Sequence, residues 1–208
     1  MRPRAIFLDR DGVLNRVFRR KDGKTHPPKT PEQAEILPGV LEGCQSLRRA
    51  GFLLIAVTNQ PDVSRGTQHR KMVEAINEKI RGQIPLDDIL VCFHDNHHHC
   101  RCRKPEPGLI LKAARRFRVD LRSSFLIGDR WTDIEAGRRS GCKTILVNAP
   151  ASEAGRCRPD LFAQSFISAS HWILQQTGGM GLQISCQSSF PLATPSLENP
   201  KKQLPDIR

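Results

Sequence analysis

Short apolar segments alternate with helical patterns along most of this chain, and that alternation limits the possible folds. The apolar segments are rich in β-branched or aromatic residues and therefore predict buried strands. They cover residues 5–8, 52–57, 89–93, 125–127 and 144–147. Apolar residues at helical spacing lie between them, as in Val40, Cys44 and Leu47 before Gly51. Such alternation builds βαβ units, so we predict an α/β protein with a Rossmann-like, doubly wound parallel sheet and helices on both faces.

Two segments depart from this alternation. Residues 15–38 are polar, basic and rich in turn formers, and we predict a loop or small hairpin over the strand ends. From residue 177 the chain is rich in Gly, Ser, Gln and Pro, so we expect a disordered tail over 177–208. Residues 159–175 could add a last strand and a helix. The expected domain therefore spans residues 1–176 and leaves no room for a large cap domain.

The charge and the absence of long apolar runs indicate the kind of partner. The formal charge is +12, which attracts anions, whether a phosphorylated metabolite or a nucleic acid. No apolar run approaches the roughly 20 residues of a membrane helix, and the apolar stretch before Asp9 is too short for a signal peptide. We therefore expect no membrane contact and a cytoplasmic location. We also expect a monomer.

Acidic and polar side chains follow the predicted strands, at the edge where the carboxyl ends of parallel strands meet and ligands bind. Asp9 and Asp11 follow the first strand, and Gly12 permits a tight turn there. Asp9 could attack a phosphorus atom, while Asp11 could protonate the leaving group and then deprotonate water. A pair of aspartates alone is more often a solvated turn, so its meaning depends on the other strand ends.

Segments that follow the other predicted strands carry further polar groups that could act on a phosphoryl group. Thr58 ends the second strand and can donate a hydrogen bond to a phosphoryl oxygen. Lys104 stands in a turn rich in Pro and Gly, where it can offset charge on a transferring phosphoryl group. Asp129 and Asp133 follow a later strand, and Asp9 and Asp129 could together hold Mg²⁺, which prefers carboxylate ligands.

In this order, the motifs resemble those of the haloacid dehalogenase superfamily of phosphohydrolases. The resemblance covers roughly residues 5–150 and rests on Asp-x-Asp-Gly-Val, a threonine, a lysine and Gly-Asp-x-x-x-Asp. It implies that Asp9 is a nucleophile forming an aspartyl-phosphate and that Asp11 is the general acid/base. The other implied roles are Asp9, the Asp11 carbonyl and Asp129 as Mg²⁺ ligands, Thr58 and Lys104 at the phosphoryl group, and Asp133 as a supporting carboxylate.

A closer resemblance is to the D-glycero-D-manno-heptose 1,7-bisphosphate and histidinol-phosphate phosphatases. One of its marks is a Cys-x-His and Cys-x-Cys set, which offers the complete tetrahedral shell of a structural zinc site. The predicted zinc ligands are Cys92, His94, Cys100 and Cys102, with His97, His98 or His99 as possible replacements for His94. Reduced thiols in a basic loop are the alternative. Zinc would fix the loop that delivers Arg103 and Lys104 to the pocket.

The resemblance and the basic residues favour a sugar bisphosphate as substrate, specifically removal of the C7 phosphate from the heptose 1,7-bisphosphate. The expected substrate-binding residues are Asn59, Arg103, Lys104 and Arg130, with Arg16, Arg19, Arg20 and Lys21 as further candidates for a second anionic group. The alternatives are a histidinol-phosphate phosphatase, a nucleic-acid 3′-phosphatase, or an inactive basic binding module. The zinc loop argues against the nucleic-acid enzyme, and the intact catalytic motifs argue against the inactive module.

Overall fold

The computed structural model describes residues 2–19 and 25–178, and these residues build one main sheet. Its six strands are all parallel and lie in the order β5-β4-β1-β6-β7-β8. They are β1 (Arg4–Leu8), β4 (Phe52–Asn59), β5 (Asp88–Cys92), β6 (Phe125–Gly128), β7 (Lys143–Val147) and β8 (Leu161–Ala163). The chain grows from β1 toward β5 and then returns to the other side of β1. Ligands of open α/β sheets bind where the strand order reverses in this way.

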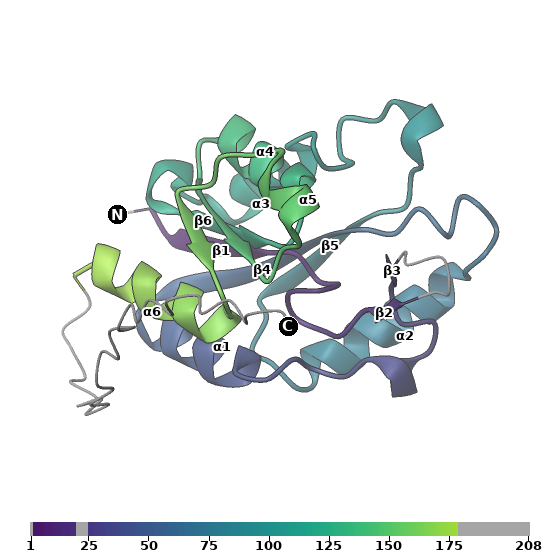
Figure 1. Cartoon of the computed structure of the whole chain (residues 1–208), viewed down its shortest axis with the longest axis horizontal. Helices are drawn as coiled ribbons and strands as arrows, with labels where there is room; N and C mark the ends of the chain where they lie inside the picture. Colours follow the sequence, from purple (N-terminus) through teal and green to yellow (C-terminus); the bar gives the residue numbers. More distant parts are fainter. Residues whose placement is uncertain (1, 20–24, 179–208) are drawn as a thin grey trace, which may run out of the picture.

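Helices cover both faces of this sheet (Figure 1). On one face lie α1 (Val40–Arg49), α2 (Arg70–Arg81) and α6 (Phe166–Gln176). On the other lie α3 (Gly108–Phe117) and α4 (Trp131–Ser140). The predicted fold class is therefore confirmed. The short helix α5 (Ala151–Ala154) was not predicted.

The side chains of β1 alternate between two apolar cores. Ile6 and Leu8 pack in the core on the side of α1, α2 and α6, whereas Ala5 and Phe7 pack in the core on the side of α3 and α4. All four are fully buried. Successive side chains of a strand point to opposite faces, and here helices cover both. The result is a continuous apolar run, which explains why the strand could be predicted.

The predicted element boundaries differ from the observed ones by a few residues. β4 continues to Asn59, and β5 begins at Asp88 and ends at Cys92, one residue earlier than predicted at each end. The chain leaves α4 at Gly141, whose φ of 86° lies in the left-handed region that glycine adopts without strain. No helix in residues 2–19 and 25–178 is long and apolar enough to cross a membrane.

The segment between β1 and α1 forms the predicted small hairpin. β2 (Phe18–Arg19) and β3 (Thr25–His26) pair in antiparallel fashion, and the 3₁₀ helix η1 (Pro31–Gln33) follows. Asn15 pairs with Ile36, so the two ends of the segment lie together. Residues 20–24 between β2 and β3 lie outside the described residues, as does the expected disordered tail from residue 179 onward.

Candidate active site

The carboxyl ends of β1, β4 and β6 bring the predicted catalytic positions to one edge of the sheet. Leu8, the last residue of β1, pairs with Ala56 on one side and with Ile127 on the other. The Asp9 N–H continues this ladder and donates to the Ile127 carbonyl at 2.9 Å. By the same register Asp9 is level with Val57 and Gly128, so Thr58 on β4 and Asp129 after β6 each follow one residue further along the chain.

Lys104 lies in the middle of this edge. Its Nζ is 2.5 Å from Asp9 Oδ1 and 2.6 Å from Asp133 Oδ1, and it also donates to the Val57 carbonyl at 2.8 Å. Only 4% of Lys104 is exposed. Burial alone would lower the pKa of Lys104, but the carboxylates of Asp133 and Asp9 outweigh it and raise that pKa. The lysine therefore carries its charge inside the site.

Three carboxylates surround that single ammonium. One oxygen each from Asp9, Asp129 and Asp133 lies within 4.8 Å of the others. Burial raises the pKa of Asp9 to about 6, with Lys104 opposing and Asp133 adding to the shift. Burial, Asp9 and Asp133 likewise raise the pKa of Asp129 well above its usual range. Asp129 Oδ1 is buried without a hydrogen-bond partner, so these carboxylates fit a divalent cation that would neutralise them.

The Asp11 carboxylate has its own set of donors. The Arg10 guanidinium donates to both of its oxygens at 2.9–3.1 Å. Gln60 Nε2 donates to Asp11 Oδ2 at 2.6 Å, and Asn15 Nδ2 donates to Asp11 Oδ1 at 3.1 Å. Neither Arg10 nor Asn15 was predicted to have a role in the site. Gln60 also donates to the Thr58 hydroxyl at 2.9 Å, so it connects Asp11 to the end of β4.

The residues expected to bind substrate do not all reach the same place. The Asn59 side chain makes two hydrogen bonds to the Lys104 backbone, at 3.1 and 3.2 Å, and so holds the turn that carries the lysine. Arg103 donates to Asn96 Oδ1 at 2.8 Å and to the His94 carbonyl at 3.3 Å. Its guanidinium therefore lies along the loop after β5.

Arg130 links the site to the hairpin. One of its nitrogens donates to the Thr25 hydroxyl on β3 at 3.1 Å, and its Nε lies 4.0 Å from Asp129 Oδ1. Two further arginines were candidates in the segment between β1 and α1. Arg16 pairs with Glu35, and Arg19 is exposed on β2. Arg20 and Lys21 lie outside the described residues.

The loop after β5 gathers the four predicted zinc ligands. Cys92, His94, Cys100 and Cys102 each offer a ligand atom within 4.8 Å of the others. The three sulfur atoms are 3.3–3.7 Å apart, near the roughly 3.8 Å that a zinc tetrahedron with Zn–S bonds of about 2.3 Å requires. His94 Nδ1 lies 3.3 Å from Cys102 Sγ. Among the described histidines, His94 is the one in this cluster, so the structure brings together the predicted set.

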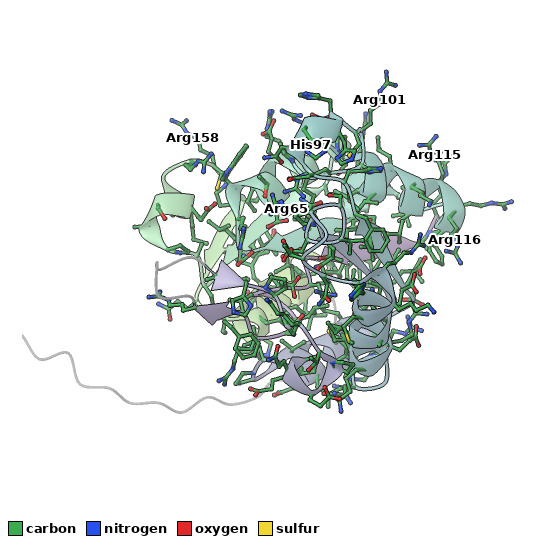
Figure 2. The ribbon with its side chains drawn as sticks, turned by 90° about the vertical axis from the view of Figure 1, so that its right-hand side faces the viewer. Arg65, His97, Arg101, Arg115, Arg116 and Arg158 are labelled. Atoms are coloured by element: carbon green, nitrogen blue, oxygen red, sulfur yellow. The ribbon has the colours of Figure 1, made fainter. Side chains whose placement is uncertain are left out.

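A bidentate ion pair ties this loop to the loop that follows β4. Arg65 donates through Nε and a terminal nitrogen to the two oxygens of Asp95, each at 2.7 Å. Figure 2 shows Arg65 and His97 on the same end of the molecule, with Arg101 at its rim. Two-point pairs of this kind fix orientation as well as distance, so the two loops are held relative to each other.

A parallel sheet with a lysine and three aspartates at its reversal point is the arrangement of the haloacid dehalogenase-like hydrolases. The family model described as "HAD-hyrolase-like" matches residues 101–169. A Pasteurella multocida protein named D-glycero-beta-D-manno-heptose-1,7-bisphosphate 7-phosphatase is 33% identical over 176 residues, which cover 78% of this chain and 92% of that protein. The chain therefore belongs to this superfamily and, within it, to the family of the heptose bisphosphate phosphatases.

Two further relatives extend the comparison. The Burkholderia mallei protein named for the alpha anomer is 35% identical over 159 residues, covering 71% of this chain and 80% of that protein. A crystal structure of the heptose bisphosphate phosphatase from B. bronchiseptica, complexed with magnesium and phosphate, superposes with a TM-score of 0.72. The two chains are 28% identical, and the match covers 83% of this chain and 99% of the other.

Proposed function

We propose that this phosphoric monoester hydrolase removes the C7 phosphate of D-glycero-D-manno-heptose 1,7-bisphosphate through an aspartyl-phosphate on Asp9. The observation that carries the proposal is the convergence of Asp9, Asp129, Asp133 and Lys104 at the reversal point of the sheet. The substrate comes from the names of the relatives, which are similar to this chain over most of its length.

In the first step, an Asp9 carboxylate oxygen attacks phosphorus while the bond between phosphorus and the sugar oxygen breaks. Asp11 gives its proton to that departing oxygen. In the second step, Asp11 takes a proton from water, the water oxygen attacks phosphorus, and the bond to Asp9 breaks. Inorganic phosphate leaves, and both aspartates return to their starting states.

The charges of the site suit a phosphoryl group in transfer. Lys104 would hold an equatorial oxygen together with the Thr58 hydroxyl, while Asp133 keeps the lysine in place through their 2.6 Å ion pair. Asp9, Asp129 and the Asp11 carbonyl would hold Mg²⁺, as the buried Asp129 oxygen without a hydrogen bond suggests. When bound, Mg²⁺ would supply positive charge that stabilises the transferring phosphoryl group.

The cysteine cluster would hold a structural zinc ion. Burial raises the pKa of the Cys92 thiol, so zinc binding would release protons as thiolates form. The ion would connect the end of β5 to Cys102, two residues before Lys104, and so stiffen the turn that carries the lysine. Free thiols of this kind persist in a reducing compartment, in keeping with the cytoplasm.

The second phosphate of the substrate would lie beside the carboxylates, where Arg130 could bind it. The Arg130 Nε lies 4.0 Å from Asp129 Oδ1, and the hydrogen bond from Arg130 to Thr25 joins the hairpin to this arginine. Histidinol phosphate has no second phosphate and would not use this contact. We treat residues 1–176 as one catalytic domain and expect a monomer.

A substrate panel tests this proposal. The panel contains both anomers of the heptose bisphosphate, histidinol phosphate and an oligonucleotide with a 3′-phosphate. We expect kcat/KM on one anomer to exceed that on histidinol phosphate at least about tenfold. Asp9→Asn should abolish turnover of every substrate, whereas Asp120→Asn, at the opposite edge of the sheet, should not. A preference for histidinol phosphate or for the oligonucleotide would overturn the substrate assignment.

A further inference from the structure

Arg10 is an unusual residue, because an arginine beside an active site is normally exposed to solvent or substrate. Its exposed fraction is 0%, although it lies between the two aspartates. Such a side chain cannot touch the substrate. Its guanidinium instead spends Nε and one terminal nitrogen on the Asp11 carboxylate, at 2.9–3.1 Å. The other terminal nitrogen donates to Asn77 Oδ1 at 2.8 Å.

Asn77 is also an unusual residue for its position, because it is polar and buried. It lies on the buried face of α2 with Val73, Ile76 and Ile80, and only 7% of it is exposed. Asparagine is a poor helix former, and a buried amide is costly unless it is hydrogen-bonded. An apolar residue would suit this face better. The bond to Arg10 is what the asparagine supplies that an apolar residue cannot.

We infer that Arg10 and Asn77 are positioning residues that fix the Asp11 carboxylate for proton transfer, an inference that rests on the proposed role of Asp11. Asp11 follows the strand in a tight turn, and its oxygens are held from two sides. The flat Arg10 fork holds both oxygens, while Gln60 and Asn15 each hold one. A guanidinium can bond a carboxylate and an amide at once because its donors are fixed in one plane.

The role of Asn77 is to fix the Arg10 guanidinium on the side away from Asp11. A guanidinium attached to Asp11 alone could swing with the loop, whereas one attached to α2 cannot. The helix is anchored in the core through Ile76 and Ile80, both fully buried. Displacement of a catalytic group by about 1 Å can lower the rate roughly 100-fold. The gain in rate from a fixed Arg10 can therefore outweigh the cost of burying the Asn77 amide.

The way in which kcat/KM depends on the leaving group separates loss of Asp11 positioning from a general loss of structure. A sugar alkoxide needs a proton to depart, whereas 4-nitrophenolate does not. The central variant is Asn77→Leu, which keeps the volume and removes the acceptor. We expect kcat/KM to fall about 10- to 100-fold on the heptose bisphosphate and less than about threefold on 4-nitrophenyl phosphate. The ratio of the two kcat/KM values should therefore change.

Three companion variants sharpen the test. Ile76→Val, a neighbour on the same buried face that makes no bond to Arg10, should leave the ratio unchanged. Asn77→Asp, which keeps an acceptor oxygen, should restore most of the wild-type ratio. Arg10→Lys, which keeps the charge and loses the fork, should behave like Asn77→Leu. An equal loss on both substrates in Asn77→Leu and Arg10→Lys would overturn the inference.

Asp11→Asn distinguishes failure of this inference from failure of the proposed function. If Asp11 is the general acid, Asp11→Asn should show the same leaving-group pattern, with a larger loss. Should Asp11→Asn lack the pattern, the proposed role of Asp11 is wrong. Should Asp11→Asn show it while Asn77→Leu does not, the catalytic role stands and the positioning role is refuted.

Discussion

At the scale of single residues, Gly12 makes the approach of two strand ends possible. Its φ of 93° is in the left-handed region, and a Cβ built on it would lie 2.3 Å from Asp129 Oδ2. That separation is far below any real contact, and the atom displaced belongs to a proposed Mg²⁺ ligand. The turn after β1 therefore requires glycine for two independent reasons, its conformation and its closeness to Asp129.

Gly51 offers a matched control for the effect of Gly12→Ala. Gly51 has a similar φ of 84°, but a Cβ there would have no atom within 4 Å. Both alanine variants should lose about 1–2 kcal/mol of unfolding free energy because of the left-handed backbone. Only Gly12→Ala should also lose activity and Mg²⁺ affinity. Urea denaturation and a magnesium titration measure the two effects, and full activity in Gly12→Ala would refute the close approach.

At the scale of elements, the strands could be predicted because helices cover both faces of the sheet. Residues 5–8 are all apolar for that reason. The convergence of Asp9, Thr58 and Asp129 at one edge could also be predicted, since the carboxyl ends of parallel strands share an edge. The cluster of three cysteines and His94 could be predicted from spacing within one short segment, which needs no knowledge of the fold.

Contacts between distant segments could not be predicted in this way. Arg10 and Asn77 are 67 positions apart, and their hydrogen bond depends on how α2 packs against the sheet. The Asn59 side chain bonds the Lys104 backbone 45 positions away, and its predicted contact with the substrate stays a prediction. A polar residue among the apolar positions of α2 was the only signal of the first contact. The sequence offers no comparable signal for the second.

The loop after β5 leads to a prediction about metal content. The double variant Cys100→Ser, Cys102→Ser should lose bound zinc, because two of four ligands become weak donors. Its melting temperature should fall, and kcat/KM should drop about tenfold or more as the turn carrying Lys104 loosens. Cys157→Ser removes a thiol outside the cluster and should retain zinc and activity. Equal metal content in all three proteins, measured by elemental analysis, would exclude the site.

At the scale of the whole molecule, we expect the clustered carboxylates to lower the stability of the metal-free protein. Asp9, Asp129 and Asp133 gather around one ammonium, so like charges repel inside a poorly solvated edge. Neutralising one of these charges should relieve the repulsion. Stability and function should therefore respond in opposite directions to the same substitution.

Asp129→Asn separates these two responses. Without metal, we expect the melting temperature of the variant to equal or exceed that of the wild type. With Mg²⁺ at about 100 times its dissociation constant, the wild type should gain about 2.7 kcal/mol of stability and Asp129→Asn very little. Asp120→Asn, at a remote aspartate, should keep the full gain. A variant that is less stable without metal yet still stabilised by Mg²⁺ would contradict the electrostatic account.

The most direct test of the account is to trap phosphate on Asp9. Asp11→Asn keeps the nucleophile but lacks the base that activates water, so its aspartyl-phosphate should accumulate with 4-nitrophenyl phosphate. After an acid quench and proteolysis, mass spectrometry should find the peptide containing Asp9 heavier by one phosphoryl group. The same peptide from the Asp9→Asn, Asp11→Asn double variant should be unmodified. Release of 4-nitrophenol without phosphate on Asp9, or an adduct on another residue, would contradict the nucleophile assignment.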